Sequence, residues 1–150
     1  MIIISNVIAF LLISYIANSF LSSKYSKNKY LAILFIFITL ESFINHTGAS
    51  PFKGIFLLIM YFLYVFIQFE GKPIQKIMII VPFFLIQVIS EILVAFCLNN
   101  ILFIEITRNA FSHGFLLGTI FSNTILAIFV FFYVRILKLI QADNLPKYTW

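Results

Sequence analysis

Residues 52–98 read FKGIFLLIMYFLYVFIQFEGKPIQKIMIIVPFFLIQVISEILVAFCL. Two long apolar runs fill this stretch, and the segment Glu70-Gly71-Lys72-Pro73 separates them. Glycine and proline together end one helix and begin the next, and a helix that crosses a bilayer needs about 20 mostly apolar residues. The stretch therefore predicts two membrane-spanning helices joined by a short turn.

Similar apolar runs occupy most of the remaining chain. Of its 150 residues, 63% are hydrophobic and 10% are charged, whereas a soluble domain has about half apolar and a quarter charged residues. We therefore predict one all-α domain over residues 1–150, a polytopic transmembrane helix bundle of about five spans. We place the spans at approximately 2–21, 30–46, 52–69, 74–98 and 111–137, followed by a cytoplasmic tail over 138–150. The first span is expected to be retained, because no basic region precedes it as in a cleaved signal peptide.

The distribution of basic residues predicts the orientation of these spans. Eight of the ten Lys and Arg residues fall on one side of the predicted bundle, namely Lys24, Lys27, Lys29, Lys72, Lys76, Arg135, Lys138 and Lys147. Only Lys53 and Arg108 fall on the other side. Positively charged connectors remain in the cytoplasm, so we expect the N-terminus outside and the C-terminus inside. Because these charges lie in short connectors, the net charge of +5 does not indicate nucleic-acid binding.

No catalytic or metal-binding motif is found in the sequence. Glycine-rich nucleotide loops, HExxH and GxSxG are absent, and His46, Cys97 and His113 lack the local spacing of metal ligands. We therefore expect no enzyme activity, no catalytic residue, no metal site and no cofactor. The lipid bilayer is the partner that the composition itself implies.

Glu91 is the strongest candidate for a functional residue. An ionisable side chain inside a span costs roughly 2.5–3.5 kcal/mol on insertion scales, so such residues face the bundle interior. Gln87 lies one helical turn from Glu91 and shares its face, with Ser90 adjacent. Two interpretations remain equally supported: a ligand-binding carboxylate, or a protonated group that hydrogen-bonds a neighbouring helix.

Other polar residues fall within or at the ends of the predicted spans. Glu41 and His113 lie near the outer ends of spans two and five. Together with Glu91, they are our candidate ligand-binding residues, although Glu41 could also contact lipid headgroups. Ser122 and Asn123 lie near the middle of span five, and with Gln87 and Ser90 they are expected to make polar contacts between helices. Asn6 and Asn18 of span one are possible partners for Asn123.

Several short motifs occur together in an order that resembles a known family. They are residues 69–76 (FEGKPIQK), residues 89–93 (ISEIL), Ser122-Asn123 within the fifth span, and the closing residues 145–150 (LPKYTW). The whole resembles the membrane sensor region of GHKL-type sensor histidine kinases, the class that contains the Agr-type receptors for secreted peptide signals in Gram-positive bacteria. The resemblance covers nearly the entire chain.

This resemblance implies a signal-input domain of a two-component system in a bacterial cell membrane. It further implies an extracellular peptide ligand and a homodimer. The chain has no phosphoacceptor-histidine region, no Asn-rich nucleotide box and no Gly-rich lid, so we expect it to sense without phosphorylating. Two other function classes remain open: a small membrane transporter subunit, and a structural or immunity-type membrane protein without a ligand.

Overall fold

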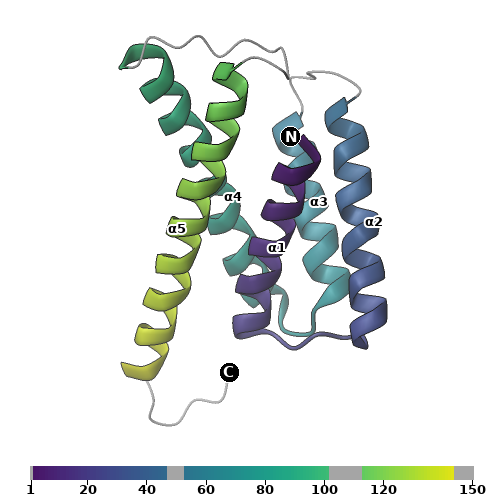
Figure 1. Cartoon of the computed structure of the whole chain (residues 1–150). Coiled ribbons are helices and arrows are strands. Elements are labelled where there is room, and N and C mark those ends of the chain that lie inside the picture. The colour runs from purple at the N-terminus through teal and green to yellow at the C-terminus, as the bar shows by residue number, and fades with distance from the viewer. Residues whose placement is uncertain (1, 47–52, 102–112, 144–150) are drawn as a thin grey trace.

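The computed structural model describes residues 2–46, 53–101 and 113–143. Over these ranges the chain forms five helices, as the composition predicted (Figure 1). Their bounds are α1 Ile2–Phe20, α2 Lys27–His46, α3 Lys53–Gln68, α4 Pro73–Asn100 and α5 His113–Asp143. The all-α fold class is thereby confirmed.

The observed helix ends agree with the predicted spans where a glycine or a proline marks the boundary. They differ from the predicted spans where lysine residues lie at the boundary. Pro73 occupies the first turn of α4, where its missing N–H leaves no hydrogen bond unmade. In contrast, α2 begins at Lys27, three residues before the predicted start, and α5 continues to Asp143 instead of ending near residue 137. Lysine, leucine and glutamine are good helix formers, so these helices extend past their apolar runs. The predicted start of the fifth span at residue 111 and the tail beyond residue 143 lie outside the described residues.

Three helices are long and apolar enough to cross a membrane. They contain the segments Ile3–Phe20, Pro73–Asn100 and Gly114–Ile140. The 16 residues of α3 are apolar but extend only about 24 Å at 1.5 Å per residue, and α2 carries Lys27, Lys29 and Glu41. The chain thus has the character of a membrane protein, while the number of spans stays a prediction.

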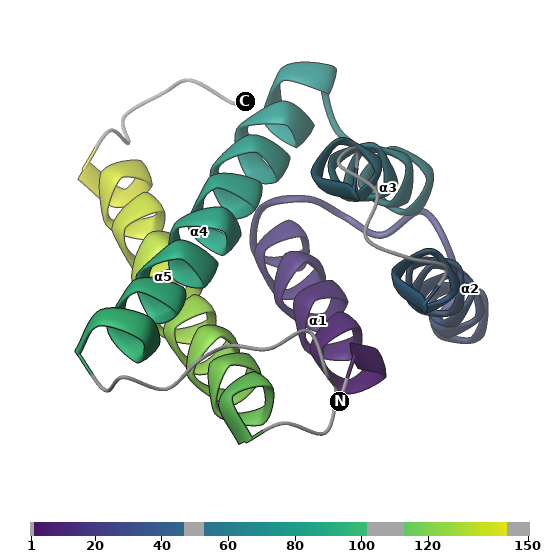
Figure 2. The same cartoon turned by 90° about the horizontal axis from the view of Figure 1, so that it is seen from above.

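The five helices run alternately up and down in one bundle with α1 at its centre (Figures 1 and 2). Helix α1 contacts each of the other four helices. We call the end at which α1 begins and α4 ends the upper end, and the end with the α1–α2 and α3–α4 connectors the lower end. The face of α1 that meets these helices is completely buried at Phe10, Ile13 and Ile16, whereas Leu11 and Tyr15 on its other face are exposed.

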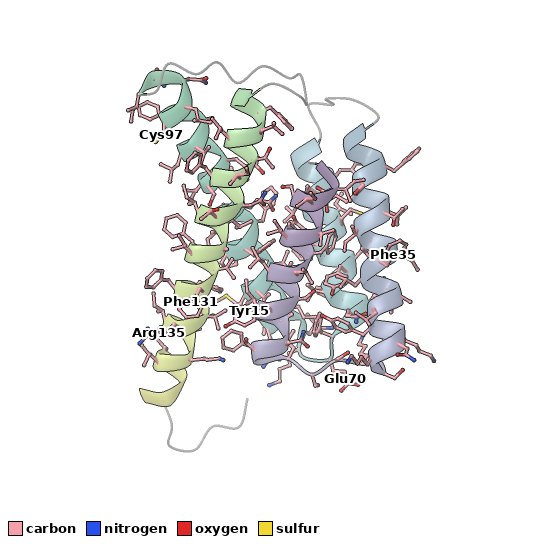
Figure 3. All side chains as sticks on the ribbon, viewed as in Figure 1. Tyr15, Phe35, Glu70, Cys97, Phe131 and Arg135 are labelled. Atoms are coloured by element: carbon pink, nitrogen blue, oxygen red, sulfur yellow. The ribbon has the colours of Figure 1, made fainter. Side chains whose placement is uncertain are left out.

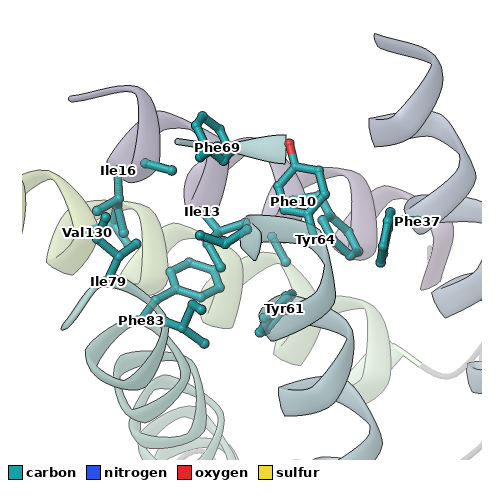
Figure 4. Packing of buried hydrophobic residues seen from close by; sticks show 14 of the residues in the cluster. Phe10, Ile13, Ile16, Phe37, Tyr61, Tyr64, Phe69, Ile79, Phe83 and Val130 are labelled. Atoms are coloured by element: carbon teal, nitrogen blue, oxygen red, sulfur yellow. The ribbon is translucent and has the colours of Figure 1, made fainter. Parts of the chain in front are cut away.

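Aromatic rings fill the interior between α1, α2, α3 and α4 (Figure 4). The ring of Phe10 meets Tyr61 and Tyr64 edge to face, with centroids 5.5 and 5.1 Å apart. Tyr61 in turn meets Phe83 at 5.2 Å. Edge-to-face contacts of this kind contribute about 0.5–1.5 kcal/mol each beyond area burial. These rings therefore hold four helices together in a chain that has few small residues for close packing.

The outer surface of the bundle is as apolar as its interior. Phe35 on α2 is 70% exposed and Phe131 on α5 is 54% exposed, and both point away from the other helices (Figure 3). Exposed apolar side chains recur along every helix. A continuous surface of this kind indicates contact with lipid rather than water.

The two lower connectors pair with each other. Ser23 and Phe69 form an isolated antiparallel bridge, in which the Lys24 amide donates to the Gln68 carbonyl at 3.0 Å and the Glu70 amide donates to Ser22 at 2.8 Å. The Lys24 ammonium also donates to the Phe66 carbonyl at 2.9 Å. These bonds fix α2 and α3 relative to α1 and α4 at the lower end.

Gly71 allows the tight turn between α3 and α4. Its φ of +134° is one that side-chain-bearing residues rarely adopt, and an added Cβ would lie 2.7 Å from Leu21 Cδ2. We expect Gly71→Ala to reduce the free energy of unfolding by roughly 1–3 kcal/mol, measured by denaturant titration in mixed micelles. Gly54→Ala is the control, because its Cβ would meet only Phe84 Cζ, at 4.0 Å. Equal stability of the two variants would contradict this explanation of the turn.

Candidate functional site: a polar cavity in the upper half of the bundle

A cavity of about 220 Å³ opens in the upper half of the bundle, where all five helices contribute to its walls. Its polar lining residues are Ser5, Asn6, Glu41, Gln87, Glu91 and Thr119. Apolar and aromatic groups such as Leu57, Phe84 and Phe115 complete the walls. A concave site with a few converging polar groups is the usual form of a small-ligand site.

Two of the three predicted ligand-binding residues meet in this cavity. Glu41 comes from α2 and Glu91 from α4, and both carboxylates lie on its wall. Glu41 is only 3% exposed, so it faces the bundle interior and not the lipid headgroups that we had considered as its alternative contact. The third, His113, begins α5, but its side chain lies outside those that the structure describes.

A hydrogen-bonded chain positions the carboxylate of Glu91. The Tyr61 hydroxyl donates to Gln87 Oε1 at 2.8 Å, and Gln87 Nε2 donates to Glu91 Oε1 at 3.4 Å. Gln87 and Glu91 line the same cavity, as their spacing of one helical turn predicted. Tyr61 was not predicted from the sequence, where its only signal is a hydroxyl in the middle of an apolar run.

Polar contacts join α1 to its neighbours around the cavity. Asn6 Nδ2 donates to Ser42 Oγ of α2 at 3.0 Å. On the other side, Asn123 Nδ2 of α5 donates to Ser5 Oγ at 3.1 Å. Asn123 thus contacts another helix through Ser5, and not through Asn6 or Asn18.

In the part of the chain that the structure describes, no hydrogen bond joins Ser90 or Ser122 to another helix. Ser90 is completely buried, yet its hydroxyl donates to the Ile86 carbonyl of its own helix at 2.7 Å. Ser122 is half-buried, and within residues 2–46, 53–101 and 113–143 the structure gives it no hydrogen-bond partner on another helix. A serine inside a helix can satisfy its hydroxyl one turn back along the same helix, so sequence alone could not assign these partners.

Asn123→Ala tests the contact between α1 and α5. Losing the bond to Ser5 should reduce the free energy of unfolding by about 1 kcal/mol, the size typical of polar contacts between membrane helices. The measurement is again denaturant titration in mixed micelles. Ser122→Ala is the neighbouring control and should leave stability unchanged. If both variants unfold like the unmodified protein, the contact contributes nothing.

Four aromatic side chains lie below the cavity, toward the lower end of the bundle. Each of them lies four residues, or about one helical turn, below a cavity-lining residue of its own helix. Phe10 lies below Asn6, Phe37 below Glu41, Tyr61 below Leu57 and Phe83 below Gln87. All four are buried, and their rings form a connected series of contacts with centroids 5.2–6.1 Å apart. We call these four residues the aromatic floor.

A second polar chain lies below the aromatic floor. The hydroxyls of Ser14 and Tyr64 are 2.6 Å apart, Tyr64 Oη donates to Tyr30 Oη at 3.4 Å, and Asn18 Nδ2 donates to the same Tyr30 oxygen at 3.1 Å. This chain involves α1, α2 and α3. It is thus separated from the carboxylates by a layer of rings.

A larger hollow of about 410 Å³ lies on the outer seam between α1 and α5. It is lined by apolar residues such as Ile4, Ile8 and Ile128, and it shares Thr119 with the polar cavity. Ser5 lines the polar cavity and Asn123 lines the hollow, so the hydrogen bond between these two residues lies between the two spaces. Because its walls are apolar, we assign the hollow to the lipid-facing surface.

Comparison with protein families, with characterised proteins and with solved structures finds no match for this chain. Within residues 2–46, 53–101 and 113–143, no group of three or more His, Cys, Asp and Glu side chains could hold a metal ion. The interpretation of the cavity therefore depends on its own geometry and chemistry.

Proposed function

We propose that the chain is a membrane-embedded signal-input domain that captures a ligand in the polar cavity from outside the cell. In this proposal it crosses a bacterial plasma membrane five times, with the upper end outside and the lower end in the cytoplasm. The observation that carries the proposal is the cavity itself, because it brings together two carboxylates predicted separately from the sequence.

The distribution of charge supports this orientation. Of the basic residues within the described ranges, only Lys53 belongs to the upper end. Those of the lower end are Lys24, Lys27, Lys29, Lys72, Lys76, Arg135 and Lys138. Basic residues near an anionic cytoplasmic leaflet each gain about 1 kcal/mol, and the positive-inside rule gives the same direction.

The aromatic floor favours a receptor over a conduit. A transporter needs a site that opens alternately to both faces, whereas a layer of four buried aromatic side chains lies below this cavity, namely Phe10, Phe37, Tyr61 and Phe83. Ligand binding would instead be transmitted through the helices, since all five of them contribute to the cavity wall. Small shifts of packed helices are an established way of passing a signal.

Cross-linking between α4 and α5 tests this function. Ile79 of α4 and Val130 of α5 are both buried in the lower half of the bundle (Figure 4). The Tyr133 hydroxyl of α5 donates to the Met78 carbonyl of α4 in the same region, at 2.8 Å. A disulfide between cysteines at positions 79 and 130 would therefore report helix movement away from the cavity. The background is Cys97→Ser, because Cys97 is exposed and free. The peptide fraction of conditioned culture medium is the probe. We expect it to change the rate of cross-linking several-fold, and Glu91→Gln to abolish that change.

Glu70→Gln is the matched control, because Glu70 is an exposed carboxylate of the lower connector. It should respond to the probe as the unmodified protein does. Cross-linking that is unaffected by every peptide fraction would count against a receptor. It would then favour a structural or immunity-type protein without a ligand.

A small transporter subunit is the second candidate, and the polar chain below the floor favours it. Ser14, Tyr64, Tyr30 and Asn18 continue the line of hydroxyl and amide groups toward the lower end. A movement of the floor would connect the two polar regions. Flux of a solute into proteoliposomes that is lost in Glu91→Gln would establish this candidate in place of the receptor.

A further inference from the structure

Two lysine ammonium groups lie against the same residue at the lower end of the bundle. Lys24 Nζ donates to the Phe66 carbonyl at 2.9 Å, and Lys76 Nζ lies 4.8 Å from the centroid of the Phe66 ring. Lys24 belongs to the connector between α1 and α2, Phe66 to the last turn of α3, and Lys76 to the first turn of α4. We call these three residues the lysine corner.

The lysine corner has more positive than negative charge. Its two ammonium groups are close enough to interact electrostatically, and the Glu70 carboxylate is the acidic group that acts on Lys76. Among the residues that the structure describes, neither lysine forms an ion pair with Glu70 or with another carboxylate. Because one carboxylate stands against two ammonium groups, the corner attracts an anion.

Lys76 places one of these charges at the boundary between the apolar bundle and its lower surface. Its side chain is only 5% exposed, and it lies three residues, or about 4.5 Å at 1.5 Å per residue, above the first residue of α4. Within the described part of the chain, its ammonium contacts the Phe66 ring and makes no hydrogen bond. A lysine ammonium has three N–H donors, so it can bind an oxygen acceptor and keep its contact with the ring.

Exposed apolar side chains continue upward from the lysine corner along the same two helices. They include Leu63 and Ile67 of α3 and Ile77 and Val81 of α4. A partner that matches both features has an anionic head and hydrocarbon chains. A soluble anion would use the lysines alone, whereas basic sites between membrane helices at the cytoplasmic side are typical sites for anionic lipid headgroups.

We propose that the lysine corner binds an anionic phospholipid. In this proposal the phosphate oxygens accept hydrogen bonds from Lys24 and Lys76, and the acyl chains lie along the exposed apolar side chains of α3 and α4. The site lies at the lower end, on the other side of the aromatic floor from the polar cavity. The inference is therefore independent of the ligand proposed for that cavity.

Two phospholipids with the same acyl chains test the inference. Dioleoyl phosphatidylglycerol carries a net negative charge, and dioleoyl phosphatidylcholine is neutral overall. Both would be added in equal amounts to the full chain in detergent micelles, and the lipid that remains bound would be counted by native mass spectrometry. We expect phosphatidylglycerol to be retained about tenfold more than phosphatidylcholine, because two lysines contribute to its binding.

A soluble phosphate ester separates a lipid site from a site for any phosphate. Glycerol 3-phosphate has the charged group of the lipid and lacks its acyl chains. At a tenfold molar excess over the lipid, it is expected to leave the bound phosphatidylglycerol in place.

Variants of the lysines locate the site. Lys24→Gln and Lys76→Gln should each reduce the preference for phosphatidylglycerol several-fold. Lys138→Gln is the matched control, because it removes the same charge from an exposed position of α5 at the lower end, and it should keep the preference. If Lys76→Gln does not fold because that side chain is buried, Lys24→Gln decides alone, since Lys24 is exposed.

Three results would overturn the inference. Equal retention of the two lipids would show that charge does not select the partner. Displacement of phosphatidylglycerol by glycerol 3-phosphate would make the corner a site for soluble anions. An equal loss of preference in Lys138→Gln, Lys24→Gln and Lys76→Gln would indicate a general attraction to the basic lower end in place of a defined site. Each of these results leaves the function proposed for the polar cavity to be decided by its own cross-linking experiment.

Discussion

Replacing Phe10 by alanine is expected to reduce the free energy of unfolding by about 3 kcal/mol, a typical loss for a buried aromatic side chain. Phe10 is completely buried in the central helix, and its ring contacts Phe37, Tyr61 and Tyr64. In a lipid environment the loss comes from missing packing contacts more than from water, because the separated helices stay in hydrocarbon. Unfolding in mixed micelles, followed by near-ultraviolet circular dichroism, measures it.

Phe35→Ala is the control for the same change in side-chain volume. Phe35 is 70% exposed on the outer face of α2, so its removal leaves no void inside the bundle. We expect its effect to be close to zero. A similar loss of stability in both variants would mean that burial in the bundle does not determine the contribution of these rings.

The second large effect concerns the orientation of the protein in the membrane. We expect an all-or-none difference in chemical labelling between a position at the upper end and a position at the lower end. In the Cys97→Ser background, cysteine at Asn100 would lie at the upper end of α4, and cysteine at Ser26 in the lower connector. A membrane-impermeant maleimide applied to intact cells should label Asn100→Cys and leave Ser26→Cys unlabelled. Ser26→Cys should react only after permeabilisation, because translocating Lys24, Lys27 and Lys29 is unfavourable.

Labelling of Ser26→Cys without labelling of Asn100→Cys in intact cells would reverse the orientation and place the cavity on the cytoplasmic side. Labelling of both positions would contradict the expected number of spans, because the upper end of α4 and the connector between α1 and α2 would then lie on the same side of the membrane. The helix pairing at the lower end would remain, since it depends on the hydrogen bonds between residues 22–24 and 68–70.

Local chemistry made the helices predictable from sequence. Apolar runs, the Gly71-Lys72-Pro73 turn and the 3.6-residue period identified the helices and placed Gln87 beside Glu91 on one face of α4. The depth of Glu91 within an apolar run also identified it as unusual, since ionisable groups are rare there, and Glu41 was identified by its position near the outer end of its span. Each of these inferences uses only residues that are close in the sequence.

Only the tertiary structure decided which faces meet. The meeting of Glu41 with Glu91 in one cavity, the pairing of Asn123 with Ser5, and the aromatic floor all join residues of different helices. In a soluble helix the apolar stripe identifies the buried side. Here lipid and bundle interior are equally apolar, so hydropathy carries no such information, and the inward face of each helix follows from packing and from a few polar contacts.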